Sequence, residues 1–267
     1  MKQHLFSSAW IVITLLLFAA CGASQADLAK LRFQKATSLL EKGDTLNALA
    51  SLDSITKLFP TAKGEIKQAN DISLRIYHSE LLKAKENIIV ATTTIRRLLP
   101  EFKAEKGEFE KYITYIPNRQ VFDKSWSRSF IQVYLNEKGD LTLASNYYGE
   151  QWIDHTFITL STESTSVNSD PVALDNFNCH HSEFGGSKWE KVSYRGKQAE
   201  LVIATIAANY EHKLKATFKG KSSYIMWLED YDKKSIQFAW ELAQALKLKR
   251  KSELSIATLE HKIKARS

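Results

Sequence analysis

The segment Asn178–Phe184, NCHHSEF, is the one stretch of this chain that looks like a chemical site. We predict a strand here, and successive side chains of a strand point to opposite faces. His180 and His181 then cannot both face one ion, whereas Cys179, His181 and Glu183 share a face. Thiolate, imidazole and carboxylate are all zinc ligands, so these three residues form a candidate metal site. The sequence does not identify a fourth ligand.

The same segment is also consistent with a purely structural role. Zinc motifs usually wrap the metal with a turn or with successive helical turns, so a half-exposed strand with ordinary histidine hydrogen bonds fits the pattern too. Cys179 and His180 could form a nucleophile and base, but adjacent residues seldom orient that way. The chain contains no G-x-S-x-G, H-E-x-x-H, P-loop or G-x-G-x-x-G sequence. The sequence therefore favours a protein that is not an enzyme, and it predicts no cofactor.

Aromatic residues give a second candidate site. The segment Ser145–Trp152, SNYYGEQW, lies where a predicted strand ends. If exposed, Tyr147, Tyr148 and Trp152 would stack on sugars or contact a partner protein. If buried, the same rings would belong to the core, which is the commoner situation for aromatic side chains.

The N-terminus predicts export. Lys2 precedes an apolar run that is strongest from Ala9 to Ala20. A helix of about 12 residues is about 18 Å long, whereas the hydrocarbon core of a bilayer is about 30 Å thick. A basic start followed by a short apolar run is typical of a signal peptide rather than of a membrane span.

The sequence Phe18–Gly22, FAACG, resembles the lipobox of bacterial lipoproteins, although Phe18 stands where that family more often has leucine. The resemblance implies that residues 1–20 are a signal peptide, that Cys21 is lipidated, and that residues 21–26 are a tether. Acyl chains on Cys21 would anchor the protein in a lipid bilayer. The alternative is an ordinary secretion signal with a chance cysteine.

Composition restricts the partners. The chain has 267 residues, a net charge of +7 and two cysteines. If Cys21 is lipidated, Cys179 has no disulfide partner, so stability must come from packing. The basic excess suits anionic lipid headgroups or acidic glycans, and a solvated surface without a partner accounts for it equally. We expect no nucleic acid as a partner, because an exported protein rarely meets it.

Residues 27–100 predict helices. Gly43 ends a first amphipathic helix and Pro60 a second. The segment Ala36–Pro60 resembles one tetratricopeptide repeat, and the matching residues are Leu40, Gly43, Asp44, Ala48, Phe59 and Pro60. No second copy follows, so a simple helical hairpin is favoured. Apolar residues at alternating spacings of three and four from Leu74 to Leu98 predict a coiled-coil-like seam, which packs within the chain or, less often, in a dimer.

The remaining elements complete an α+β fold. Residues 101–124 are charged and predict an irregular connector. Residues 125–228 alternate with a period of two and predict an antiparallel sheet domain with an inserted helix at residues 199–210. Residues 229–267 predict a long C-terminal helix. The expected order is an N-terminal helical hairpin with coiled-coil-like helices, then the sheet domain, then the long helix.

The chain also resembles uncharacterised lipoproteins of Bacteroidetes-type envelopes, through the lipobox and the stretches WSRSFIQVYLNEKGDL, WEKVSY and MWLEDYDKKSI. This resemblance implies no particular activity. We expect a lipid-anchored protein of the bacterial cell envelope, in the outer membrane, because Gly22 gives no strong inner-membrane retention cue. It would act as a non-enzymatic protein-binding or scaffold module with an envelope protein as partner. The alternatives are glycan binding by sheet aromatics and a metal-dependent enzyme around Cys179, His181 and Glu183.

Overall fold

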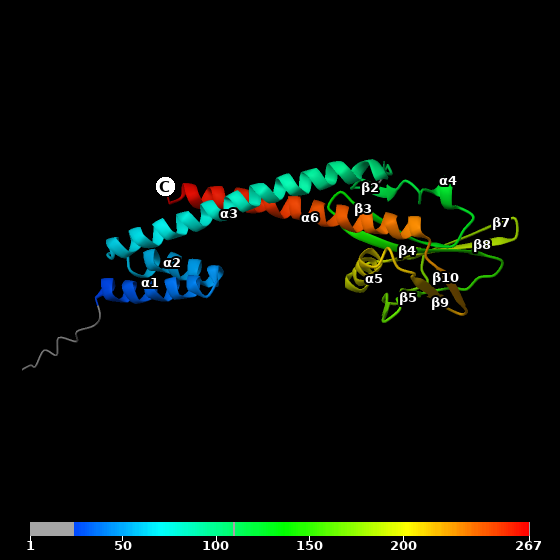
Figure 1. Cartoon of the computed structure of the whole chain (residues 1–267), viewed down its shortest axis with the longest axis horizontal. Coiled ribbons are helices and arrows are strands. Elements are labelled where there is room, and N and C mark those ends of the chain that lie inside the picture. Colours follow the sequence, from blue (N-terminus) through cyan, green and yellow to red (C-terminus); the bar gives the residue numbers. More distant parts are fainter. Residues whose placement is uncertain (1–23, 109, 267) are drawn as a thin grey trace, which may run out of the picture. The chain divides into compact units, whose positions relative to one another are not determined.

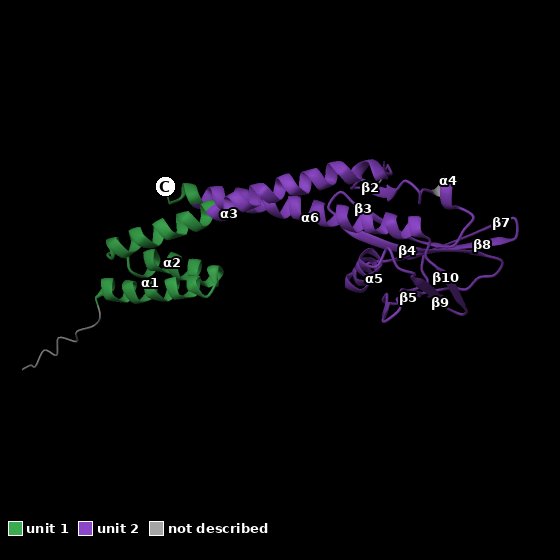
Figure 2. Ribbon diagram, viewed as in Figure 1, with its two compact units in different colours: residues 1–78, 263–267 green, residues 79–262 purple. Residues whose placement is uncertain are grey.

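The computed structural model describes residues 24–108 and 110–266, and the fold is α+β, as predicted (Figure 1). The chain divides into two compact units, residues 1–78 with 263–267 and residues 79–262 (Figure 2). Within the described part, unit 1 is helical and unit 2 carries both sheets. The predicted signal peptide and Cys21 lie outside the described residues. None of the described helices is long and apolar enough to span a bilayer.

Unit 1 contains the predicted helical hairpin, with α1 at Gln25–Glu41 and α2 at Thr45–Leu58. The Ser24 hydroxyl accepts a hydrogen bond from the Asp27 backbone N–H, and the Asp27 carboxylate accepts one from the Ser24 N–H. This capping box begins α1 inside the predicted tether. Gly43 turns the chain between the helices with φ at +78°, a conformation that favours glycine. The core of the hairpin is formed by Ala29, Ala36, Leu52 and Ile55.

Two long helices follow, α3 at Lys63–Leu98 and α6 at Asp230–Lys264. In unit 2 the buried side chains of α3 recur every seven residues, at Ala84, Ala91 and Leu98. Residues 80–87 of α3 and 247–259 of α6 line one shared hollow, and these parts of the two helices run side by side within unit 2 (Figure 1). Leu98, the last residue of the predicted seam, belongs to the apolar core of unit 2 together with Ile236 and Leu242 of α6.

The main sheet of unit 2 has six antiparallel strands in the order β1-β2-β3-β4-β8-β7. Their bounds are Phe102–Glu105, Thr114–Pro117, Phe130–Asn136, Leu141–Gly149, Ser187–Tyr194 and Cys179–Phe184, in that order. The sequence predicts an irregular connector at residues 101–124, yet this segment contains β1 and β2. The 3₁₀ helix η1 (Leu99–Glu101) overlaps its start, and α4 (Phe122–Ser125) overlaps its end. Strands of four residues are at the lower limit for a period of two to show.

A second sheet has the order β10-β9-β5-β6. Its strands span Ser223–Trp227, Lys215–Lys219, Phe157–Ser161 and Ser166–Asn168. The predicted inserted helix is α5, Lys197–Ala208. Both sheets, α5 and α6 contribute to one apolar core, which includes Ile131, Leu143, Val192, Leu160, Phe218, Val202, Ile236 and Leu242. The core is therefore shared by elements that are far apart in the sequence.

The register of the six-stranded sheet places its residues on two faces, because directly paired residues point to the same side. One row of paired residues consists of Ile131, Ser145, Val192 and Cys179. The neighbouring row, which points to the opposite side, consists of Phe130, Asn146, Lys191 and His180. We call the side of the first row the core face and the side of the second row the cleft face.

Candidate functional site

The three predicted metal ligands do lie on one face, because Cys179, His181 and Glu183 alternate along β7. Their contacts differ, however. The Cys179 thiol is buried and donates a hydrogen bond to the Ala173 carbonyl oxygen at 3.4 Å. Burial raises the pKa of this thiol, which disfavours the thiolate that a metal needs. The Glu183 carboxylate pairs with the ammonium group of Lys188. The structure therefore does not bring these three side chains together around one point.

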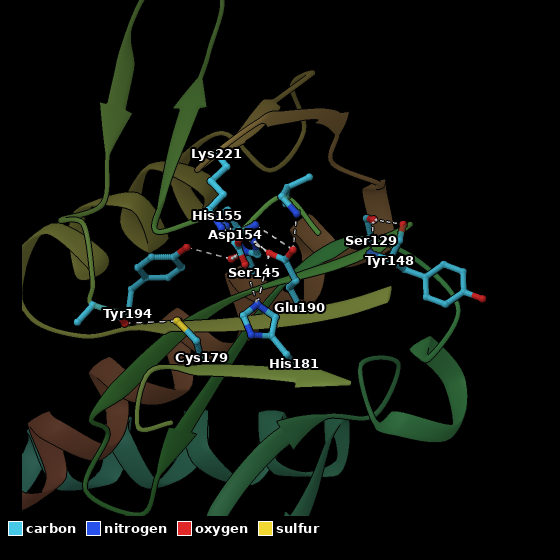
Figure 3. Close-up of polar contacts among 12 residues, drawn as sticks. Ser129, Ser145, Tyr148, Asp154, His155, Cys179, His181, Glu190, Tyr194 and Lys221 are labelled. Atoms are coloured by element: carbon cyan, nitrogen blue, oxygen red, sulfur yellow. Dashed lines mark hydrogen bonds and ion pairs between the residues drawn. The ribbon is translucent and has the colours of Figure 1, made fainter. Parts of the chain in front are cut away.

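His181 instead faces residues from two other segments. Its Nε2 lies 3.6 Å from Asp154 Oδ1 and 4.0 Å from Glu190 Oε2 (Figure 3). Ligand atoms of these three residues all lie within 4.8 Å of one another, a spacing that a metal ion could bridge. Sequence reasoning missed Asp154 and Glu190, because they come from a loop and from β8 and share no spacing motif with His181.

Both carboxylate oxygens of Glu190 already accept hydrogen bonds from other groups of the chain. Its Oε1 accepts from the backbone N–H groups of Ile153 and Asp154, and its Oε2 accepts from the backbone N–H and the Nδ1 of His155. A carboxylate offers about four lone pairs, so these donors saturate it. Burial opposes ionisation, but the His155 ring and the two N–H groups outweigh it and lower the pKa of Glu190. We therefore interpret Glu190 as the anchor of the loop 153–155 rather than as a metal ligand.

The hydrogen bonds continue from His155 into the core. His155 Nε2 lies 2.6 Å from the Ser145 hydroxyl oxygen, which lies 3.1 Å from the Tyr194 hydroxyl (Figure 3). Serine, histidine and carboxylate follow one another in the order of a serine hydrolase triad. Yet Ser145, His155 and Glu190 each have 0% exposed surface, so no substrate can reach the serine oxygen in this fold. This chain of groups stabilises the structure.

The loop itself is held in an unusual conformation. Asp154 has a φ of +47°, which residues other than glycine rarely adopt. Its carboxylate pairs with Lys221 at 2.7 Å. A side chain at Gly220 would meet the Asp154 carbonyl oxygen at 2.1 Å, so only glycine allows this close approach. Glu190 and Gly220 together fix the loop from two sides.

The cleft face carries a different kind of site. A hollow of about 330 Å³ lies over the row Phe130, Asn146, Lys191 and His180, and a second of about 350 Å³ adjoins it. The two hollows share His180, Ser182 and Trp189, so they form one cleft. Cavities of this size are typical of small-ligand sites. The second hollow is lined mainly by rings, those of Trp126, Tyr148, Phe184 and Trp189.

Three buried polar atoms of the first hollow have no hydrogen-bond partner within the described part of the chain. They are Gln120 Oε1, Gln132 Oε1 and Asn146 Nδ2. Their residues are only 1%, 5% and 2% exposed. An unpaired buried polar atom costs about 1–3 kcal/mol, and native proteins contain few of them. The lining of this hollow therefore has hydrogen-bonding capacity that the described chain does not use.

Hydrogen bonds of the side-chain NH₂ groups hold the amides of Gln120 and Gln132 in place. Gln120 Nε2 donates to the backbone carbonyl oxygen of Ile131 at 3.0 Å and to Asp232 Oδ1 at 2.9 Å. Gln132 Nε2 donates to the backbone carbonyl oxygen of Gln120 at 2.8 Å. Asp232 is buried and also receives two hydrogen bonds from the Arg128 guanidinium, at 2.6 and 3.0 Å. This bidentate pair attaches the wall of the cleft to the start of α6. Both glutamine oxygens are thus fixed before any ligand arrives.

The three aromatic residues predicted from the sequence lie in three different places. Tyr148 lines the cleft, and its hydroxyl donates to Ser187 at 3.0 Å. Tyr147 is buried on the core face, with its ring edge-on to Tyr224 at 5.1 Å. Trp152 packs edge-on against His181 at 4.8 Å. Of the predicted set, only Tyr148 belongs to the cleft.

Comparison with known proteins gives no match: no protein-family model, no curated protein and no solved structure is significantly similar to this chain.

Proposed function

We propose that the protein is a lipid-anchored protein of the bacterial envelope that binds carbohydrate in the cleft of its six-stranded sheet. The sequence favours a non-enzymatic binding module, and the cleft favours the glycan alternative over a protein partner. The observation that carries the proposal is the group of three unpaired amide atoms, on Gln120, Gln132 and Asn146, beside the ring of Trp189.

Sugars suit such a lining because each hydroxyl is both a donor and an acceptor, whereas the C–H groups of the ring are apolar. Two glutamine oxygens offer acceptors and the asparagine NH₂ offers donors. The rings of Trp189 and Tyr148 offer a flat apolar surface in the adjoining hollow. Aromatic residues and fixed polar groups side by side are typical of a specific small-ligand site.

Binding without hydrolysis is favoured by the charges of the lining. Glycoside hydrolases of most families use two carboxyl groups on either side of the scissile bond. Among the described residues that line the two hollows, Glu105 is the one with a carboxylate. The cleft thus offers contacts to a sugar but not the pair of acids that this chemistry uses.

The binding test uses the full processed protein in detergent and a panel of immobilised glycans. We expect binding to one group of glycans, and a loss of affinity of about tenfold or more in Trp189→Ala, because a central ring is worth more than about 1.4 kcal/mol. Trp227→Ala is the matched control, since that ring is exposed on β10 of the other sheet. Trp189→Phe should retain most of the affinity. Absence of glycan binding by the wild type would overturn the proposal.

The anchor is tested separately. In Cys21→Ser the thioether cannot form, so the protein should leave the membrane fraction, whereas Cys179→Ser should remain there. Mass spectrometry of the processed N-terminus should show acyl chains on Cys21. An unmodified thiol at this position would remove the envelope anchor without affecting the glycan proposal.

A further inference from the structure

We propose that the sugar bound in the cleft is acidic and that its carboxylate is held by the ammonium group of Lys191 together with the Asn146 side-chain amide. This inference rests on the proposed carbohydrate site and adds the chemical class of its ligand. The class is that of uronic acids and related carboxylated sugars.

Two residues that carry hydrogen-bond donors occupy neighbouring positions in the cleft. Asn146 of β4 and Lys191 of β8 are directly paired in the register, and both line the hollow of about 330 Å³. Asn146 Nδ2 donates no hydrogen bond within the described chain. An ammonium and an NH₂ group in adjacent positions form a pair of donors, and a carboxylate is the acceptor that satisfies both.

Lys191 forms no direct ion pair with a carboxylate of the described residues, and Glu105 favours its charge only from a longer distance. No carboxylate of the described residues lies within 4.0 Å of its ammonium group, which lies 5.3 Å from the centre of the Tyr134 ring. Glu105 lines the same hollow, but its carboxylate pairs with Lys103 at 2.9 Å. Burial lowers the pKa of Lys191, so the cleft bears a desolvation cost for this charge. An anionic group on the ligand would compensate for that cost.

The two glutamine oxygens favour an acidic sugar over a simple anion as the ligand. Gln120 Oε1 and Gln132 Oε1 are acceptors, so an anion alone would leave both unpaired. A ligand that satisfies the whole hollow needs one anionic acceptor and at least two donors. A sugar with a carboxylate and free hydroxyls has this combination, and its apolar ring face suits Trp189.

The experiment compares sugars whose carboxyl groups are either free and charged or neutralised as methyl esters. Calorimetry on the full processed protein in detergent measures affinity for trigalacturonic acid and for its fully methyl-esterified form, and the comparison is repeated with glucuronic acid oligomers. We expect the free acid of one series to bind about tenfold or more tightly than its ester. In Lys191→Met that preference should disappear while the ester binds as before, and Lys191→Arg should retain it in part.

Lys188→Met is the matched control, because Lys188 lies on the same strand but on the core face, where it pairs with Glu183. This variant should keep the preference for the acid, and thermal melting should show that every variant is folded. Equal affinity for acid and ester in every series that binds would overturn the acidic ligand and leave the carbohydrate site in place. Failure of the wild type to bind any glycan of the panel would instead overturn the carbohydrate site itself.

Discussion

The two faces of the six-stranded sheet differ in whether their buried polar groups are fully hydrogen-bonded. On the core face, Glu190, His155 and Ser145 are fully buried and hydrogen-bonded to one another. On the cleft face, the amides of Gln132 and Asn146 are nearly as buried, yet each keeps an atom without a partner among the described residues. Fully paired buried polar groups stabilise a fold, whereas unpaired ones cost stability and persist where something else completes them. Burial alone therefore does not mark a functional site.

Both faces are built from the same strands. Ser145 and Asn146 are neighbours on β4, and Glu190 and Lys191 are neighbours on β8. Because side chains alternate along a strand, each pair contributes one residue to the core face and one to the cleft face. Substitutions at neighbouring residues of one strand can therefore compare the roles of the two faces in stability and in binding.

The largest expected effect is that of Glu190→Gln. The variant keeps the shape of the side chain but loses the charge and half of the acceptor capacity, so donors of the loop 153–155 are left unpaired in the core. Breaking such a buried arrangement costs about 3–5 kcal/mol of the free energy of unfolding. Urea denaturation measures the loss. The exposed Glu183→Gln should change the value by about 0.5 kcal/mol or less, and a similar small change in Glu190→Gln would contradict the anchoring role.

Ser145→Ala should have the next largest effect. The substitution removes the hydroxyl that bridges His155 Nε2 and the Tyr194 hydroxyl, and it leaves both of these buried groups without that partner. The expected loss is about 1–3 kcal/mol in the free energy of unfolding. Ligand binding in the cleft should be unaffected, because the serine lies on the other face. A binding defect without a stability defect would show that the two faces are coupled.

A pH effect should follow from the lowered pKa of Glu190. The folded value lies below the ordinary value of 4.5, so this carboxylate contributes stability above about pH 4.5 and loses it as the pH falls through the folded pKa. Urea melts of the wild type at decreasing pH should show this loss. In Glu190→Gln the corresponding part should be absent, so the two stability curves should converge at low pH. Parallel stability curves would mean that the hydrogen-bond partners of Glu190 do not stabilise its ionised form.

Much of the fold was predictable because it rests on local patterns. The helical hairpin, the β3–β4 hairpin, the inserted helix and the long C-terminal helix each have a clear period and a turn or cap, as at Gly43. The short strands β1 and β2 were missed, because four residues of mixed polarity show no distinct period. Propensity and periodicity describe an element but not its partners.

The candidate sites were less predictable because they combine residues that are distant in the sequence. The alternation in β7 correctly placed Cys179, His181 and Glu183 on one face, but it could not show that Asp154 and Glu190 are the neighbours of His181. The cleft joins Gln132, Asn146 and Lys191 through the strand order β3-β4-β8-β7, in which β8 lies next to β4 although the two are far apart in the chain. No local motif records that order.

The smallest expected effect on stability, and the sharpest test of the difference between the faces, belongs to Asn146→Leu. Asn146 Nδ2 has no partner within the described chain, so the variant exchanges an unpaired buried amide for an apolar side chain of similar size. The free energy of unfolding should change by less than about 1 kcal/mol, because the lost polar group brought no compensating hydrogen bond. Affinity for the glycan should nevertheless fall by about tenfold or more, since the donor is lost and a leucine cannot replace it. Urea denaturation and calorimetry on the same preparation measure the two quantities. A large loss of stability with unchanged affinity would place Asn146 with the core face residues and leave the cleft without its central donor.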